Sequence, residues 1–273
     1  MALSDLQQLM IEHRFRPNHK FSQNFIINDS LVEKMVKEAD LKKTDVVLEI
    51  GSGAGTLTEK LLEKAHVVGV ELDSSLTMVL EDRFGKNKNF TLVKGDFLKV
   101  DLPKFNKVVA LPPYNISSDI ILRLVREDFD CVLLVFQKEF VEKIVAEPGF
   151  CEYSYISVLT DFLFKTKVIV SSISPASFYP KPETYSALIK LTRRKKLSGI
   201  KDFEKFIMFV KNIFRYKNKD FSNALKNCLK SMKGSFPKKD YSELIEKKGL
   251  TNVKTNLLTT EEVVDFFKKI SQE

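Results

Sequence analysis

The stretch VVLEIGSGAGTLT, residues 46–58, decides the fold of this chain. It begins with aliphatic and β-branched residues, continues through three glycines at alternate positions, and ends at the start of an amphipathic segment. This pattern predicts a buried strand, a tight turn and a helix. Because glycine adopts positive φ and lets a ligand approach the backbone, Gly51, Gly53 and Gly55 indicate the first turn of a nucleotide-binding α/β sheet. A plain strand-to-helix turn is the simpler alternative.

The spacing of the glycines narrows the choice of ligand. A dinucleotide fingerprint has glycine at its first, third and sixth positions, so that a pyrophosphate lies at the helix start, whereas the sixth position here is Thr56. Glu49 ends the strand, where its carboxylate would repel a phosphate but could bind a cationic ligand or orient the loop. The loop therefore resembles the S-adenosylmethionine loop of class I methyltransferases, whose cofactor carries a sulfonium and no phosphate.

Further strands follow at the spacing of an α/β sheet, with acidic residues at their ends. Glu71 ends the second strand, where a carboxylate can accept hydrogen bonds from both ribose hydroxyls, and Asp96 ends the third, where it can accept from an adenine amino group beside Phe97. We expect two more parallel strands, then two antiparallel strands joined by a proline-stiffened loop, and finally helices. The predicted fold is α/β, Rossmann-like, with a mainly parallel seven-stranded sheet, an antiparallel C-terminal hairpin strand and a small all-α domain.

The charge is unevenly distributed along the 273 residues. Residues 1–192 contain 24 Lys and Arg against 26 Asp and Glu, whereas residues 193–273 contain 20 against 10. A basic tail attached to a nearly neutral domain favours a polyanionic partner, nucleic acid first. The simpler alternative is that these lysines only solvate exposed helices. Residues 192–198 read as a linker, and residues 1–18 as a loosely held arm.

Cysteine and histidine content and the absence of long apolar runs bear on the cellular compartment, on membrane spans and on metal sites. The three cysteines form no CxxC pair, which is typical of reduced thiols, and no leader or apolar run of about 18 residues is present. We therefore expect a cytoplasmic protein without a membrane span. The three histidines are scattered, so no metal site is expected, and nothing suggests an obligate dimer.

The turn Leu111-Pro112-Pro113-Tyr114 follows the fourth strand and is expected beside the cofactor. Two prolines remove two amide donors and leave carbonyl acceptors, while Tyr114 offers a flat ring. Such a rim suits the exocyclic amino group of a base, because acceptors hold the amine in line with a methyl group without a strong general base. In folded RNA the base would first have to leave its stack. A turn that merely ends a strand is the alternative.

At this point nearly the whole chain resembles the adenine dimethyltransferases of small-subunit ribosomal RNA, the kasugamycin-resistance group with archaeal and eukaryotic relatives. The segment QNFI, residues 23–26, is similar to the family's first cofactor segment, and residues 49–58 to its cofactor loop. Glu71 matches its ribose ligand, and Gly95-Asp96 its adenine ligand. Residues 137–139 and SFYPKP, residues 177–182, resemble further signatures, and residues 215–225 resemble a basic RNA-binding helix.

The resemblance implies the residues of the site. The catalytic set is Leu111, Pro112, Pro113, Tyr114 and Phe178, the last placed against the target adenine. The cofactor-binding set is Gln23, Asn24, Ile26, Glu49, Gly51, Gly53, Gly55, Glu71, Leu72, Asp96, Phe97 and Leu111. The RNA-binding set is Arg193, Arg194, Lys195, Lys196, Arg215, Lys217 and Lys219.

The resemblance also implies the reaction and the partners. Residues 1–192 would form the catalytic domain that binds S-adenosylmethionine, and residues 193–273 a helical, basic RNA-binding domain. Two methyl groups would be transferred to each of two adjacent adenosines near the 3′ end of small-subunit ribosomal RNA, during small-subunit biogenesis. The partner would be this RNA or the precursor particle that contains it.

One departure from the family bears on activity. The family has Asn-Leu-Pro-Tyr at the catalytic turn, so Leu111 stands where a side-chain amide would accept from the target amine. This leaves open a weakened enzyme, or an assembly factor that binds RNA and cofactor without transferring methyl groups. An adenine methyltransferase of the large subunit is a further alternative. DNA amino-methyltransferases fit the turn less well, and a small-molecule methyltransferase would not explain the basic tail.

Overall fold

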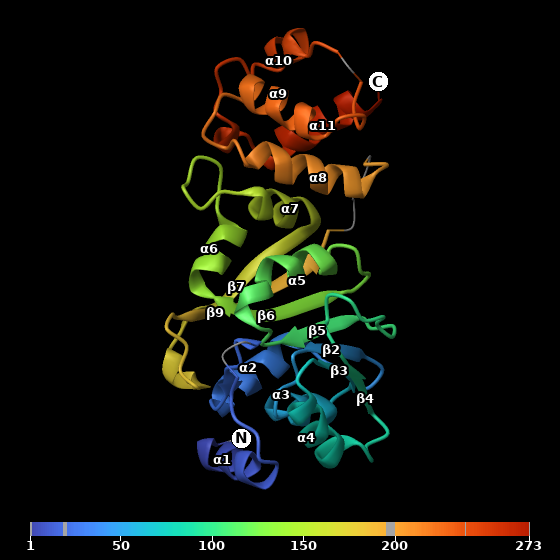
Figure 1. Ribbon diagram of the computed structural model, residues 1–273, viewed down its shortest axis with the longest axis vertical. Helices are drawn as coiled ribbons and strands as arrows, with labels where there is room; N and C mark the ends of the chain where they lie inside the picture. The colour runs from blue at the N-terminus through green and yellow to red at the C-terminus, as the bar shows by residue number, and fades with distance from the viewer. Residues whose placement is uncertain (1, 19–20, 195–199, 238, 273) are drawn as a thin grey trace. The chain divides into compact units, whose positions relative to one another are not determined.

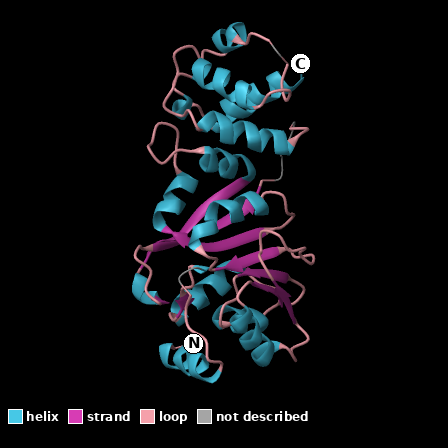
Figure 2. Ribbon diagram, viewed as in Figure 1, coloured by secondary structure: helices cyan, strands magenta, loops and turns pink. Residues whose placement is uncertain are grey.

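The computed structural model describes residues 2–18, 21–194, 200–237 and 239–272, and they divide into two compact units. The first unit contains residues 1–141 and 166–193, and the second contains residues 142–165 and 194–273. Figures 1 and 2 show that the strands gather in the first unit and that the second is helical. Among the described residues, no helix is both long enough and apolar enough to cross a membrane.

The first unit is built around a seven-stranded sheet with the order β4-β3-β2-β5-β6-β9-β7. Its strands are β2 (Val46–Ile50), β3 (His66–Glu71), β4 (Phe90–Lys94), β5 (Lys107–Ala110), β6 (Cys131–Gln137), β7 (Phe164–Ile173) and β9 (Ser186–Arg193). β2 pairs in parallel with both β3 and β5, β3 with β4, and β5 with β6, whereas β9 runs antiparallel to β6. The expected mainly parallel sheet with an antiparallel C-terminal strand is confirmed.

The chain order places a topological switch between β2 and β5. From β2 the chain proceeds outward through β3 and β4, and then returns to the other side of β2 as β5. In open parallel sheets, ligands bind at the carboxyl ends of the strands where the order reverses in this way. The glycine turn after β2 and the proline turn after β5 are therefore brought to the same crevice.

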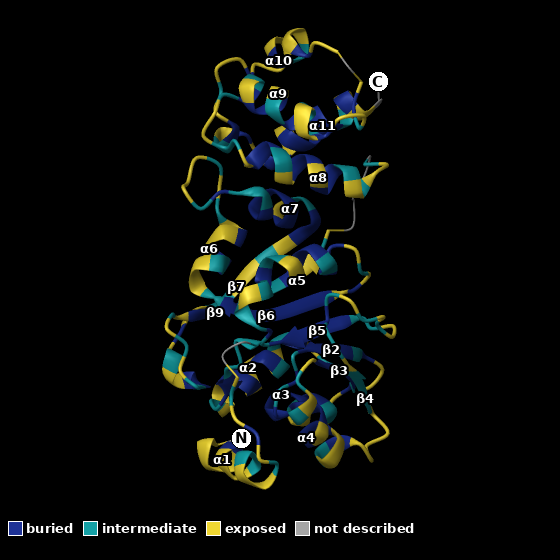
Figure 3. Ribbon diagram, in the orientation of Figure 1, coloured by how far each residue is buried: buried dark blue, intermediate teal, exposed yellow. Residues whose placement is uncertain are grey.

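Helices of the first unit cover the sheet and bury its apolar side chains. They are α1 (Leu3–Glu12), α2 (Asp29–Ala39), α3 (Thr56–Leu62), α4 (Ser74–Phe84), α5 (Ser117–Leu124) and the start of α6 (Lys138–Val145). α2 and α3 share one apolar cluster with alternate residues of the central strands, including Val47, Val67, Val109 and Leu133. Figure 3 shows the central strands almost wholly buried, as strands covered on both faces must be.

The N-terminal segment is folded, so the expectation of a loosely held arm is wrong. α1 buries Leu6 completely, and Phe15 is 4% exposed. Both pack with Leu76 and Val79 of α4. The pattern was missed because α1 is short and only one of its faces meets the rest of the unit, so its few apolar residues form a weak period. A two-stranded sheet of β1 (Phe25–Ile26) and β8 (Phe178–Tyr179) was also not foreseen.

The second unit has an aromatic core. It contains α7 (Tyr155–Leu163), α8 (Phe203–Phe214), α9 (Phe221–Ser231), α10 (Ser242–Lys247) and α11 (Thr260–Gln272). The Phe206 ring packs edge-on against Phe162 and Phe267, and Phe221 against Phe266. The tail beyond residue 193 therefore forms a helical unit together with α7, a segment that sequence reasoning had placed in the catalytic domain.

Candidate functional site

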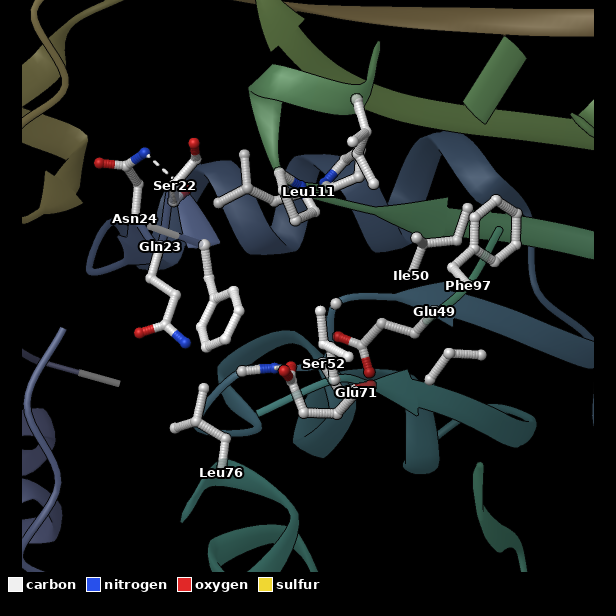
Figure 4. Close-up of a pocket in the computed structure, with 18 of the residues that line it drawn as sticks. Ser22, Gln23, Asn24, Glu49, Ile50, Ser52, Glu71, Leu76, Phe97 and Leu111 are labelled. Atoms are coloured by element: carbon white, nitrogen blue, oxygen red, sulfur yellow. Dashed lines mark hydrogen bonds between the residues drawn. The ribbon is translucent and has the colours of Figure 1, made fainter. Parts of the chain in front are cut away.

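A pocket opens at the switch point between β2 and β5. Figure 4 shows side chains from several helices, strands and loops that line it. Its walls are the segment around β1, the glycine turn, the end of β3, the loop after β4 and the proline turn after β5. Those walls contain Phe21, Ser22, Gln23, Asn24, Phe25, Ile26, Glu49, Gly51, Ser52, Gly53, Glu71, Leu72, Leu76, Gly95, Asp96, Phe97, Leu111, Pro112, Pro113, Tyr114 and Asn115, among others.

The glycine turn requires glycine at both positions that line the pocket. Gly51 has φ +73° and Gly53 has φ +59°, a region that other residues rarely adopt. A Cβ on Gly51 would lie 3.3 Å from Cδ of Pro113, and one on Gly53 would lie 3.2 Å from the ring of Phe25. The turn therefore lets two other walls of the pocket approach its backbone closely.

Two buried carboxyl groups flank this turn. Oε2 of Glu71 accepts a hydrogen bond from the backbone N–H of Gly53 at 2.8 Å, and Oε1 accepts from the N–H of Asp73 at 2.9 Å. Glu49 accepts from the Thr58 hydroxyl at 2.5 Å. Burial raises the pKa of Glu71, and burial, with the nearby Glu71 adding to it, raises the pKa of Glu49 to about 8. Figure 4 shows both groups beside Ser52.

The loop after β4 is held by an arginine from α5. The guanidinium of Arg123 donates to the carbonyl of Phe97 and, at 2.6 Å, to that of Val100, and it lies 4.8 Å from the centroid of the Phe97 ring. Asp96 accepts from the backbone N–H of Leu98 at 2.9 Å. These contacts fix Asp96 and Phe97 at the pocket wall.

The segment before β1 closes another side of the pocket. Gln23 accepts from the backbone N–H of Asn18 at 2.7 Å and donates to Oδ2 of Asp73 at 2.8 Å, so it links the N-terminal segment to the loop after β3. Asn24 donates to the carbonyl of Ser22 at 3.1 Å, which stabilises a local turn. Ser22 has φ +49°, a conformation in which a glycine would be less strained.

The proline turn positions one aromatic ring. The hydroxyl of Tyr114 shares a 2.7 Å hydrogen bond with Oγ of Ser186, and the Tyr114 carbonyl accepts from Ser117 at 2.8 Å. Burial raises the pKa of Tyr114 to about 12, so the phenol is neutral at physiological pH. The ring is therefore held in place and cannot act as a base. Leu111 is half-buried and packs against the apolar cluster of α2 and β5.

The carboxyl groups that line the pocket fit a cofactor without phosphate groups. Glu49, Glu71 and Asp96 line it, and the described lining residues include neither lysine nor arginine. Phosphate groups need donors or positive charge, whereas the sulfonium and ammonium groups of S-adenosylmethionine are compatible with neighbouring carboxyl groups. Within the described chain, Glu71 presents oxygens to hydroxyls, and Asp96 with Phe97 presents an acceptor and a flat apolar face to an adenine. These acceptors and the apolar face therefore fit S-adenosylmethionine.

Most of the site residues expected from the sequence meet at this pocket, but Gly55 and Phe178 do not. Gly55, with φ +86°, starts α3, and a Cβ there would lie 2.5 Å from the ring of Phe84. This glycine is required for helix packing. Phe178 is fully buried in the apolar cluster of α2 and the sheet. It pairs with Ile26, which lines the pocket, so Phe178 lies behind the pocket wall and is not exposed to a base in this structure.

The expected RNA-binding residues are largely engaged within the protein. Arg193 donates to the carbonyls of Val125 and Glu127, and Arg194 pairs with Asp161 at 2.9 Å. The remaining members of the set are placed as follows. Lys217 donates to the carbonyls of Cys151 and Tyr153 at 2.7 and 3.2 Å, Arg215 and Lys219 are exposed, and Lys195 and Lys196 lie outside the described residues. Residues 215–220 form the turn between α8 and α9, so the expected basic helix begins only at Phe221.

Sequence reasoning missed several residues of the pocket. Phe25 follows the amides of the first cofactor segment and packs on the glycine turn, and Leu76 stands in the first turn of α4. An aromatic residue directly after Gln23 and Asn24 was a usable signal for Phe25. Arg123 gave no signal, because its contacts to the loop after β4 depend on how α5 is placed.

Strand order, glycine turn and acidic pocket together define an S-adenosylmethionine-dependent methyltransferase of class I. The family model for ribosomal RNA adenine dimethylase matches residues 14–269. The chain belongs to the ribosomal RNA adenine dimethylase family.

Individual relatives agree with this assignment. The chain is 42% identical over 204 residues to a probable ribosomal RNA small subunit methyltransferase A of Methanococcoides burtonii, covering 74% of this chain and 75% of that protein. It is 38% identical over 244 residues to one of Methanosarcina mazei, covering 89% of each. A dimethyladenosine transferase structure from Plasmodium falciparum matches with a TM-score of 0.80 and 27% identity, covering 91% of this chain and 98% of that one. The structure of the 23S rRNA methyltransferase ErmE matches with a TM-score of 0.66 and 23% identity, covering 91% of this chain and 100% of that one, so it shares the fold.

Proposed function

We propose that the protein dimethylates N6 of two adjacent adenosines near the 3′ end of small-subunit ribosomal RNA, and that it acts on this RNA within a precursor particle. The observation that carries the proposal is the meeting of the Leu111–Tyr114 turn with the acidic pocket at one switch point. The names of the relatives from Methanococcoides and Methanosarcina support the small subunit as the substrate.

The turn supplies acceptors and a ring for the chemistry. S-adenosylmethionine, when bound, supplies the electrophilic methyl group. The carbonyls of Leu111 and Pro112 are acceptors for the two hydrogens of the exocyclic amine, and Tyr114 offers a ring face for stacking. An aromatic amine is a weak nucleophile, because its lone pair is delocalised, and acceptors that hold it in line favour the pyramidal geometry of attack. The methylated amine is cationic and releases its proton to solvent.

Methyl mapping by mass spectrometry tests the proposal. Small- and large-subunit RNA would be isolated from cells with and without the protein. We expect dimethyladenosine at two adjacent positions of the small-subunit RNA only in cells that contain it. Methylation confined to large-subunit RNA would replace the proposal with the large-subunit alternative, and no difference in either RNA would contradict it.

A second candidate rests on Leu111. If the missing side-chain acceptor abolishes transfer, the protein would be an assembly factor that binds small-subunit RNA and cofactor. Turnover above background with purified protein and undermethylated small subunits would dismiss this candidate.

A further inference from the structure

A second concavity in the first unit is unused by the proposed reaction. Its walls come from α1, from the segment that follows α1, and from Tyr179 of β8. Arg14 and Arg16 provide its polar lining together with Gln7, while Phe15 provides an apolar floor that is 4% exposed. No acidic side chain is found among the described residues that line it. We call it the arginine site.

The two cations of this site are available to a ligand. Within the described part of the chain, neither the guanidinium group of Arg14 and Arg16 nor the hydroxyl of Tyr179 has a hydrogen bond or an ion pair. The acidic residue closest to them in sequence, Glu12, accepts from Gln8 at 2.8 Å.

These two arginines differ from the basic residues expected to bind RNA. Arg193, Arg194 and Lys217 donate to main-chain carbonyls of their own unit and so hold the fold together. Arg14 and Arg16 are exposed and lie together in a hollow that also presents a phenol. Two unpaired guanidinium groups can each bind a phosphate through two parallel N–H donors.

The arginine site is separated from the cofactor pocket by a pair of packed aromatic rings. Phe15 of the arginine site packs edge-on against Phe25, with the ring centroids 6.1 Å apart. Phe25 lines the cofactor pocket and packs on the glycine turn. In addition, Phe25 is the ladder partner of Tyr179, so the small β1–β8 sheet contributes to both sites.

We propose that the arginine site binds the phosphodiester backbone of the substrate RNA next to the target adenosine, an inference that rests on the proposed function. Arg14 and Arg16 bind phosphate oxygens, and the hydroxyl of Tyr179 donates to a third acceptor or its ring stacks on a neighbouring base. Contacts to the backbone position the strand without reading its sequence. An adenosine withdrawn from its stack needs such a hold on the flanking strand while its base occupies the reaction pocket.

The test compares the salt dependence of RNA binding in two matched double variants. R14Q/R16Q removes the two charges of the arginine site, and K86Q/K88Q removes two exposed charges from the loop after α4. The probe is a 3′-terminal fragment of small-subunit RNA. Each lost contact to single-stranded phosphate reduces the slope of log K against log salt by about 0.7. We expect R14Q/R16Q to reduce the slope by about 1.4 and the affinity at 0.1 M salt by about 10-fold, and K86Q/K88Q to change neither.

Further measurements separate a failure of this inference from a failure of the proposed function. If the wild-type protein methylates small-subunit RNA but both double variants bind the fragment equally well, only the arginine site is overturned. If the wild-type protein methylates no RNA, the proposed function is overturned, and the arginine-site inference that rests on it falls with it. R14K/R16K keeps both charges, so it should retain the wild-type slope; a slope as low as that of R14Q/R16Q would assign the two arginines a structural role and overturn the inference.

Discussion

Replacing Leu111 with asparagine should raise the rate of methyl transfer. The Leu111 side chain is half-buried and packs against the apolar cluster of α2 and β5, at the start of the turn that faces the glycine loop. An asparagine there adds a carbonyl acceptor for the target amine, which gains positive charge during attack. A hydrogen bond to a charged group contributes about 1.5–3 kcal/mol, or about 10- to 100-fold in rate.

The same substitution has a cost in stability that must be separated from its effect on rate. Removing a half-buried leucine should lower the free energy of unfolding by about 1–2 kcal/mol. Leu111→Ala is the matched control, because it loses the same packing and adds no acceptor. The assay is incorporation of tritiated methyl groups into undermethylated small subunits. If Leu111→Asn is no faster than Leu111→Ala, this position never carries the amine contact and the reasoning is refuted.

Three further outcomes are expected. Glu71→Gln should weaken S-adenosylmethionine binding about 10- to 100-fold, because an amide NH2 replaces one of the two buried oxygens offered to the ribose hydroxyls; calorimetry checks this against Glu33→Gln on an exposed face. Because burial raises the pKa of Glu49 to about 8, the folded state holds a proton that the unfolded state releases near pH 4.5. Glu49 should therefore make stability fall as pH rises between about 4.5 and 8, by at most about 1.4 kcal/mol per pH unit, and the pH dependence of denaturant unfolding should be shallower for Glu49→Gln by this contribution. Lys217→Gln should lower the unfolding free energy by about 1 kcal/mol, because it removes the hydrogen bonds to an exposed carbonyl and a part-buried one, whereas Lys219→Gln should leave the thermal midpoint unchanged.

The sheet and its ligand crevice could be predicted because their sequence signals are local. The run of residues 46–50 and the glycines after it predict a strand and turn by themselves, and acidic residues at strand ends are placed by the geometry of a parallel sheet. Glu71 and Asp96 therefore fell where expected.

The features that failed depend on tertiary contacts between distant segments. α1 is held by the surface of α4, and Phe178 is buried because β8 pairs with β1, about 150 residues earlier. The internal role of Lys217 depends on carbonyls of residues 151 and 153, which no local pattern connects to the turn between α8 and α9. A count of basic residues cannot distinguish a lysine that bridges loops from one that is free for RNA.

Equilibrium binding of radiolabelled S-adenosylmethionine, with and without small ribosomal subunits, tests the central claim most directly. We predict one saturable site per chain for the wild type and its loss in Gly53→Val, because a side chain at φ +59° would press on Phe25. The absence of saturable binding by the wild type even with its ribosomal particle, or full binding by Gly53→Val, would contradict the account.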